Sequence, residues 1–372
     1  MQPSLPGAGK TSVFAAVAAV AAQVTESARA ARGISIAVLG VSFLLRAVGD
    51  ASERDWISWL SPVGWAQRVR PFANERWWVF ALFAVATAVL VAVAYALSTR
   101  RDLGAGLLPA RPGPARASPA LQSPLGLAWR LQRGTLLAWT LGFAVLGGVL
   151  GSVGNTAAKI GADSPQLRAV IERLGGSSAL ADKWFVLVMG ILGLVASGYA
   201  IGAALRPRGE EAGGRLEPVL ATAVGRLRWL ASHLLFAVVG PAVALGAAGL
   251  AAGLSYGIAS GDVGEELPRI LAAALVQLPA VWVLAGISVA LYGVLPRLVA
   301  FGSWAALALL VLLGQFGELL QLDQWMLNIS PFTHVPKLPG GDFSTSPLIW
   351  LTAIAAALVA AGLTAFRRRD VG

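Results

Sequence analysis

Long apolar segments alternate with shorter polar segments along most of this chain. Eight of the apolar segments approach or exceed the ~20 residues that an α-helix needs to cross the ~30 Å core of a bilayer, where only helices and closed barrels satisfy their own backbone. A ninth segment is shorter, and we interpret it as a truncated span. The pattern therefore predicts an all-α membrane protein, a polytopic helical bundle of about nine transmembrane helices, over residues 13–24, 33–49, 77–97, 134–153, 184–205, 230–258, 270–294, 299–316 and 348–366.

The composition agrees with a membrane location. Hydrophobic residues make up 56% of the 372 positions and charged residues only 13%, whereas a soluble domain carries about 25% charged residues. This composition leaves too little polar surface for a soluble enzyme or a secreted scaffold. The chain has no Cys and only two His, His233 and His334, so we expect neither a disulfide framework nor a metal site.

The basic excess of the chain follows from membrane topology. The net charge is +10, and Lys and Arg collect on the cytoplasmic side of membrane proteins. If residues 367–369 lie in the cytoplasm, the alternation of spans puts the six Arg of residues 98–133 and the five Arg of residues 206–228 on the same side. We therefore predict a multi-pass protein of the plasma membrane with a cytoplasmic C-terminus and an external N-terminus. We expect these basic residues to face the lipid bilayer and not to bind nucleic acid.

An internal repeat relates the two ends of the chain. Ser61-Pro62 recurs as Ser330-Pro331 at an offset of 269 residues, and Arg100-Arg101-Asp102 recurs as Arg368-Arg369-Asp370 at an offset of 268. Order and near-constant offset indicate duplication, so that the last three spans copy the first three.

The repeat predicts one and a half copies of a six-helix unit. Residues 1–97 would be the C-terminal half of a first unit, with its first helix truncated. Residues 98–133 would form a cytoplasmic linker rich in Pro and Arg that ends in an interfacial helix, and residues 134–372 a complete second unit. On this interpretation roughly three and a half spans of an ancestral twelve-span arrangement are absent from the chain.

The segment 206–233 is acidic where a cytoplasmic loop is expected to be basic, since it holds three glutamates. The last of them is followed by Pro218, and arginines come later, before Trp229, an order that suits a helix and its dipole. Apolar residues recur at helical spacing here, so we expect a short amphipathic helix at the membrane surface. A plain solvated loop is the alternative. The residues expected to meet a partner are Glu210, Glu211, Glu217, Leu220 and Arg226.

Several stretches carry a family resemblance: Glu210-Glu211, residues 214–222, 224 and 226–229, Ser61-Pro62, residues 330–332 and residues 367–370. They resemble the type-2 permeases of ATP-binding-cassette exporters, particularly the actinobacterial exporters proposed to carry polyketide antibiotics. The resemblance implies that the acidic loop and its helix are the coupling element, which sits in a cleft of a cytoplasmic ATPase subunit, expected as a dimer. It places ATP and Mg²⁺ on that partner, with no cofactor on this chain. The resemblance implies a twelve-span chain made of two six-span units. The nine spans predicted for this chain depart from that arrangement.

Two further sets of residues are candidates at the membrane surfaces. Trp129, Arg130 and Arg133 alternate with leucines, which suits a short interfacial helix with Trp at the headgroup level. On the outside, Ser61-Pro62 and Ser330-Pro331 each follow a Trp-bearing apolar stretch. Such stretches fold back as short re-entrant or interfacial helices, and in the family they resemble a lid over the exit of the pathway, an outer gate. Alternatively, and with equal weight, the Trp residues of these stretches form an aromatic belt at the membrane surface.

The pattern of polar residues bears on the mechanism. No Asp, Glu, Lys or His lies near the middle of a predicted span, where ion-coupled carriers hold a titratable group. Neither His has an evident nucleophile partner for catalysis. We therefore predict a permease subunit, not an enzyme itself, that moves an amphipathic or apolar compound such as an antibiotic or other drug out of the cell with a separate ATPase. A non-transporting membrane assembly factor or a membrane enzyme is the alternative.

Overall fold

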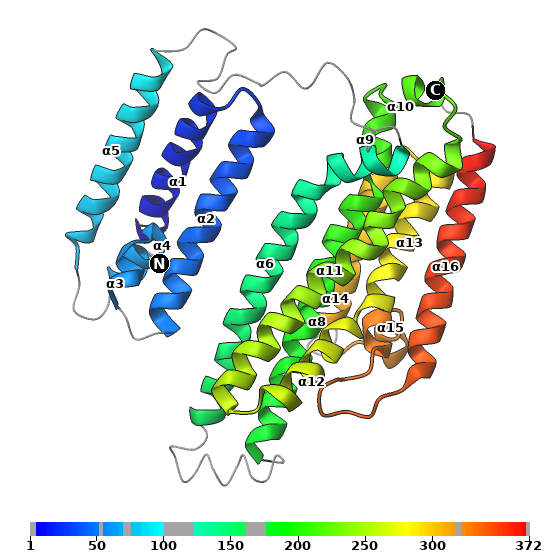
Figure 1. Ribbon diagram of the computed structural model, residues 1–372. Coiled ribbons are helices and arrows are strands. Elements are labelled where there is room, and N and C mark those ends of the chain that lie inside the picture. The colour runs from blue at the N-terminus through cyan, green and yellow to red at the C-terminus, as the bar shows by residue number, and fades with distance from the viewer. Residues whose placement is uncertain are drawn as a thin grey trace. The chain divides into compact units, whose positions relative to one another are not determined.

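The structure is a computed structural model that describes residues 5–51, 55–69, 76–99, 123–160, 176–316 and 321–369. Throughout these ranges the regular secondary structure is helical, without a strand (Figure 1). The chain divides into two compact units, Met1–Ala115 and Arg116–Gly372. Most of the predicted linker, residues 100–122, lies outside the described residues, as does Asp370 of the predicted repeat.

The first unit is a small helical cluster. Helix α1 packs against α2 and α5, and the cluster buries Val13, Val69, Val79 and Phe83. Helix α1 begins well before the predicted residue 13, because a Pro is tolerated in the first helical turn and Gly9 leaves room for the Phe83 ring. The helices are α1 (Leu5–Val24), α2 (Ala28–Ala51), α3 (Asp55–Trp59), α4 (Pro62–Arg68) and α5 (Val79–Ser98).

The second unit is a larger bundle built around one long helix. Helix α11 packs against α6, α8 and α12, and α13 packs against α16. The helices are α6 (Pro124–Ile160), α8 (Gly176–Ala204), α9 (Arg206–Ala212), α10 (Leu216–Leu220), α11 (Arg226–Ser260), α12 (Val263–Leu275), α13 (Leu278–Val294), α14 (Val299–Phe316), α15 (Gln324–Leu327), the 3₁₀ helix η2 (Pro331–His334) and α16 (Thr345–Arg368).

Small residues allow the close packing in this bundle. A side chain at Gly147 of α6 would meet the backbone of Ala248 in α11, and one at Gly362 of α16 would meet the backbone of Val289 in α13. Membrane helices associate through such small residues, since lipid offers no hydrophobic driving force between them. The Gly- and Ala-rich composition of the spans is therefore used for helix contacts.

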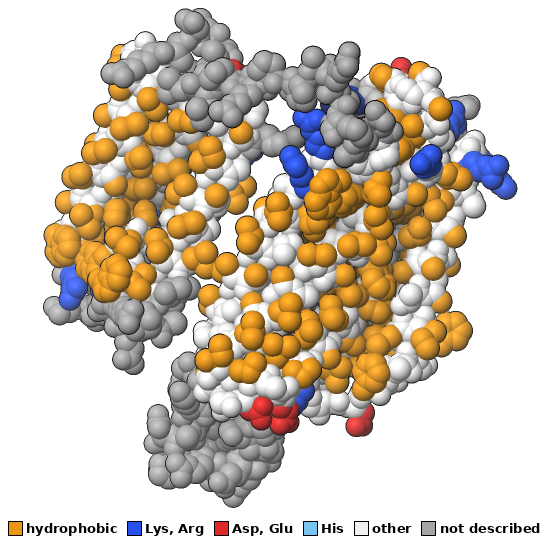
Figure 2. All heavy atoms as spheres, viewed as in Figure 1, with side chains coloured by type: hydrophobic (Ala, Val, Ile, Leu, Met, Phe, Trp, Pro, Cys, Tyr) orange, Lys and Arg blue, Asp and Glu red, His pale blue; other side chains and the backbone are white. Residues whose placement is uncertain are grey.

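Six helical segments of the described residues are long and apolar enough to cross a membrane. Figure 2 shows apolar side chains covering the helices of the second unit, with Lys and Arg mainly at the end formed by α9, α10 and the C-terminus of α16, and carboxylates at the opposite end near α12. The chain is thus a multi-pass helical membrane protein. The six segments are Val79–Ser98, Pro124–Gly154, Leu180–Ala212, Arg226–Ser260, Val263–Val294 and Thr345–Arg368, and shorter apolar helices cover Gly9–Val24 and Val299–Gly314.

The predicted span 270–294 lies within the candidate span Val263–Val294, but it is not one continuous helix, because α12 ends at Leu275 and α13 starts at Leu278. Pro279, in the first turn of α13, lacks the N–H that would continue the ladder of hydrogen bonds. Conversely, the interfacial helix expected before the span 134–153 is not a separate element, since α6 runs without a break through Gly134, which a helix tolerates at modest cost.

Candidate functional site

The two adjacent glutamates of the acidic segment lie on a short helix at one end of the second unit. Helix α9 begins directly after α8, with Pro207 in its first turn, and it ends before Gly214, whose backbone has the left-handed φ of +66° that glycine adopts without strain. Helix α10 follows after one further residue. We call the helices α9 and α10 together the elbow.

Glu211 joins the elbow to the ends of two long helices. Its Oε1 accepts a hydrogen bond from Arg369 Nη2 at 2.5 Å, and its Oε2 accepts one from the Tyr292 hydroxyl at 2.9 Å. Arg369 Nη1 also donates to the Tyr292 carbonyl oxygen at 3.0 Å. Glu211, Tyr292 and Arg369, which we call the latch, therefore connect α9 with the C-terminal ends of α13 and α16.

Aromatic rings complete the surroundings of the latch. The Arg369 guanidinium lies 5.0 Å from the centre of the Tyr292 ring and 5.4 Å from that of Phe366, within the range of cation–π attraction. The Phe366 ring stacks on Tyr292 at 5.4 Å and on Trp229 at 6.4 Å. The Arg369 charge is thus held by a carboxylate and two rings, and its side chain is only 17% exposed.

Glu210 acts within the elbow. It is buried, accepts a hydrogen bond from Arg215 Nε at 2.6 Å and forms an ion pair with Arg206 at 3.3 Å. The hydrogen bond and the charge of Glu210 raise the pKa of the Arg215 guanidinium. Both adjacent glutamates are consequently paired with residues of this chain.

The short helix expected at Glu217-Pro218 is present as α10, but its predicted continuation to Trp229 was wrong. Helix α10 stops at Leu220, and α11 starts only after Gly225, whose backbone is extended. The β-branched and small residues between them form a turn instead. Glu217 is exposed on α10 and Leu220 is partly buried, whereas Arg226 lies at the start of α11 and donates to the Arg369 carbonyl oxygen at 3.1 Å.

The predicted interfacial residues lie on the outer face of α6. Trp129, Arg130 and Arg133 are exposed. The opposite face of the same turns is buried, with Gln132 Nε2 at 3.4 Å from His233 Nδ1 of α11. This division into an exposed basic and aromatic face and a packed face suits the border of a membrane.

The predicted outer-gate residues lie in different units. Ser61 caps α4, accepting from the backbone N–H of Val63 at 3.1 Å, and its Oγ donates to the Ser42 carbonyl at 2.6 Å. Ser330 precedes η2 and is buried, and its Oγ has no partner among the described residues. Pro62 and Pro331 each occupy the first turn of the following helix. The two motifs thus start helical turns, one in each unit.

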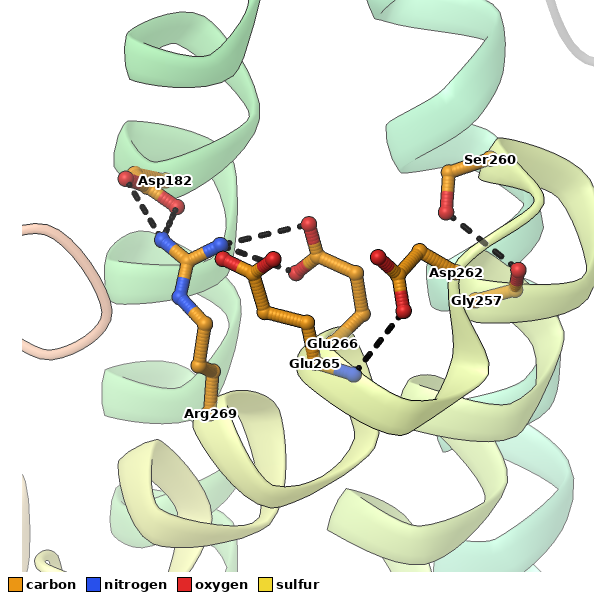
Figure 3. Close-up of polar contacts among 7 residues, drawn as sticks. All are labelled: Asp182, Gly257, Ser260, Asp262, Glu265, Glu266 and Arg269. Carbon is orange, nitrogen blue, oxygen red and sulfur yellow. Dashed lines mark hydrogen bonds and ion pairs between the residues drawn. The ribbon is translucent and has the colours of Figure 1, made fainter.

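A second charged cluster lies at the other end of the bundle (Figure 3). Arg269 of α12 donates through Nη2 to both carboxylate oxygens of Asp182 of α8, at 3.0 and 3.1 Å, and through Nη1 to both oxygens of Glu266, at 3.2 and 3.1 Å. We call Asp182, Glu266 and Arg269 the triad. Asp262 caps α12 by accepting from the Glu265 N–H at 3.1 Å.

Sequence reasoning missed the partners in both clusters. Residues 367–369 were noticed for topology, for the repeat and for the family resemblance, but not as partners of Glu211, and nothing in the sequence marks Tyr292 or Arg269. The Glu211–Arg369 pair joins positions 158 residues apart, and the Asp182–Arg269 pair joins positions 87 apart. Only the packing of α8, α12, α13 and α16 brings these residues together.

The fold defines a multi-pass helical membrane protein whose elbow is tied to two of its long helices. Residues 121–367 match the family model described as "Multidrug efflux system permease Rv1217c, C-terminal domain". The chain therefore belongs to this family. It is also 48% identical over 359 residues to the multidrug efflux system permease protein Rv1217c of Mycobacterium tuberculosis (strain ATCC 25618 / H37Rv). That match covers 96% of this chain and 65% of the relative, so the chain spans about two thirds of the length of the relative.

Proposed function

We propose that the chain is the membrane-spanning permease subunit of an ATP-driven exporter that moves amphipathic or apolar compounds out of the cell. The name of the relative, a multidrug efflux system permease protein, supports this proposal. A separate cytoplasmic ATP-binding-cassette ATPase, acting as a dimer with ATP and Mg²⁺, supplies the energy, and the chain itself is a transport subunit and not an enzyme.

The observation that carries the proposal is the tie between the elbow and the long helices. A coupling element must present a surface to the ATPase and must also pull on the spans. Glu217 is exposed on α10, next to the exposed Pro218. Glu211, on the neighbouring α9, is bonded to Tyr292 of α13 and Arg369 at the end of α16. A displacement of the elbow by a partner is therefore passed to α13 and α16.

This arrangement assigns different roles to the three glutamates. We propose that Glu217 and Leu220 contact the ATPase, while Glu210 and Glu211 hold the elbow together and connect it to the spans. Arg226 belongs to the connecting set, since it donates to the Arg369 carbonyl oxygen. Charged hydrogen bonds of this kind resist small displacements better than apolar contacts, because they lose energy steeply as their geometry departs from linear.

We propose that the chain has nine spans and that its last three spans repeat its first three. Support comes from the local form of the two Ser-Pro segments. In each, a short helix, α3 or α15, precedes the Ser-Pro pair, a second short helix follows it, and a long apolar helix, α5 or α16, comes next. These segments would form the outer gate. The elbow, α16's end and the basic face of α6 would then lie in the cytoplasm, as the charge distribution predicts.

The proposal is tested by crosslinking and transport. A photo-crosslinking amino acid at position 217 should capture an ATP-binding-cassette ATPase in cells, whereas the same probe at Glu265, exposed at the other end of the bundle, should not. In inside-out vesicles with ATP, the complex should accumulate ethidium or the neutral dye Nile red. Glu217→Lys should abolish this accumulation.

Three results contradict the proposal. The first is capture of the ATPase from position 265 and not from 217. The second is accumulation that does not depend on ATP. The third is a Glu217→Lys variant that accumulates dye as well as the unaltered chain while inserting normally.

A further inference from the structure

An open groove lies beside the triad, between α12, α16 and the loop that joins η2 to α16. Its volume is about 620 Å³, within the ~300–1,000 Å³ of small-molecule sites. Its surface is almost wholly apolar apart from Arg269 at one end. We call it the α12–α16 groove, and its lining includes Arg269, Ala272, Gly340, Phe343 and Leu348.

The positive charge of the Arg269 guanidinium, which lines the groove, is already neutralised by carboxylates. Both terminal nitrogens of Arg269 already donate to carboxylates, two oxygens on Asp182 and two on Glu266 (Figure 3). Two carboxylates thus face one guanidinium, so the triad is negative by one charge. An anionic head group would meet this excess and would have to displace a carboxylate to reach Nη1 or Nη2.

The surroundings add further negative charge. Asp262 and Glu265 stand next to the triad in Figure 3, and both are exposed. The adjoining segments contribute two exposed lysines, Lys183 and Lys337, and one exposed carboxylate, Asp342. Among the described residues of the triad and these segments, five acids therefore stand against three bases. Next to an apolar surface such an excess acts over several ångströms, because the local dielectric constant is low.

The loop that lines the groove lies against the same cluster. Gly340 has φ +91°, and its backbone lies so close to Asp182 that a side chain there would collide with the carboxylate. The loop that carries Phe343 therefore approaches the triad closely at Gly340. The Phe343 ring is 62% exposed, and an aromatic face attracts cations.

We propose that the α12–α16 groove binds cationic amphiphiles, with the apolar tail on the α12 and loop side chains and the cationic head at the acidic end beside Phe343. The inference deepens the proposed export function by naming a substrate class, and it rests on that function only for its biological role. Binding itself is measured without transport, so the two proposals fail separately.

The test uses the absence of Cys from the chain. A single Cys at Leu348, in the groove, carries a trifluoromethyl label, and a second protein has the label at Ala361, an exposed residue farther along α16. Each full-length protein, in nanodiscs, is titrated with dodecyltrimethylammonium, dodecyl sulfate and dodecyl maltoside, which share one tail. The fluorine shift at 348 should saturate at a concentration at least about tenfold lower for the cation than for the other two, and no saturable shift should appear at 361.

Two variants separate the parts of the site. Asp262→Asn with Glu265→Gln removes two charges, keeps a capping side chain on α12 and should weaken cation binding by about tenfold. Ala272→Trp should fill the groove and abolish the shift, whereas Ala361→Trp should not.

The proposal is overturned if the three amphiphiles shift position 348 at equal concentrations, which would make the groove a seat for any acyl chain. It is also overturned if the double variant keeps the cation preference or if 348 and 361 respond alike. ATP-dependent accumulation of Nile red without cation binding would retain the export function and remove only this site. Cation binding without any accumulation would retain this site and contradict the export function.

Discussion

Removal of the Glu211 charge should loosen the elbow. In Glu211→Gln the side chain keeps its shape and one hydrogen-bonding oxygen, but the Arg369 guanidinium loses its carboxylate partner at 2.5 Å. The two side chains are 14% and 17% exposed, so water replaces the lost contact only in part. Glu217 on α10 is exposed, which makes Glu217→Gln the matched control for loss of one acid from the elbow.

The size of the expected loss in unfolding free energy follows from the burial of Glu211 and Arg369. Two unit charges 4 Å apart attract by about 4 kcal/mol at the effective dielectric constant of ~20 that suits sites near a protein surface, and desolvation offsets part of this gain. Hydrogen bonds to charged groups contribute about 1.5–3 kcal/mol. We therefore expect Glu211→Gln and Arg369→Gln each to lower the free energy of unfolding by about 2 kcal/mol, and Glu217→Gln to change it by less than about 0.5 kcal/mol.

The assay is reversible unfolding in SDS of the two single variants and of the double variant. Because both single changes break the same contact, the double variant should fall short of their sum by about 1–2 kcal/mol. The swap Glu211→Arg with Arg369→Glu should recover part of the loss. Additive single effects, or a Glu217→Gln variant as unstable as Glu211→Gln, would refute the latch.

Two further predictions concern hydroxyl groups and topology. Tyr292→Phe should cost about 1 kcal/mol of unfolding free energy because its hydroxyl donates to Glu211, while Tyr199→Phe should be neutral because that buried hydroxyl has no partner among the described residues; equal losses in thermal unfolding would contradict this. Cys at Gly213 should resist an impermeant reagent in intact cells and Cys at Ser177 should react, since the charge distribution predicts that they lie on opposite sides of the membrane; the reverse labelling would contradict the predicted orientation.

The helical membrane character of the chain could be read from its apolar segments. Apolar runs of about 20 residues must be helical in lipid, because each backbone group has to find its partner within the segment. The six candidate spans accordingly contain or overlap the predicted segments at 77–97, 134–153, 184–205, 230–258, 270–294 and 348–366. The acidic segment was likewise recognisable, since three glutamates in a basic context need no structure to be noticed.

Helix boundaries within the polar segments could not be read as well. The run from Glu217 to Trp229 has helical spacing, but the chain turns at residues 221–225 and buries Trp229 against Phe366. Local spacing competes there with the packing of a large ring, and in a five-residue helix such as α10 the packing prevails, because so short a helix has little stability of its own.

The partners of the charged residues required the three-dimensional arrangement. A sequence shows that Glu211 and Arg269 are charged. The electrostatic free energy of each side chain, however, depends on its burial and on its distance from charged groups that are far away in the chain. Arg369 meets Glu211, and Asp182 meets Arg269, because α16 packs on α13 and α12 packs on α8. Hydrophobic length is a local property, so the chain displays it directly, whereas electrostatic pairing is a property of the assembled bundle and appears only when the helices are together.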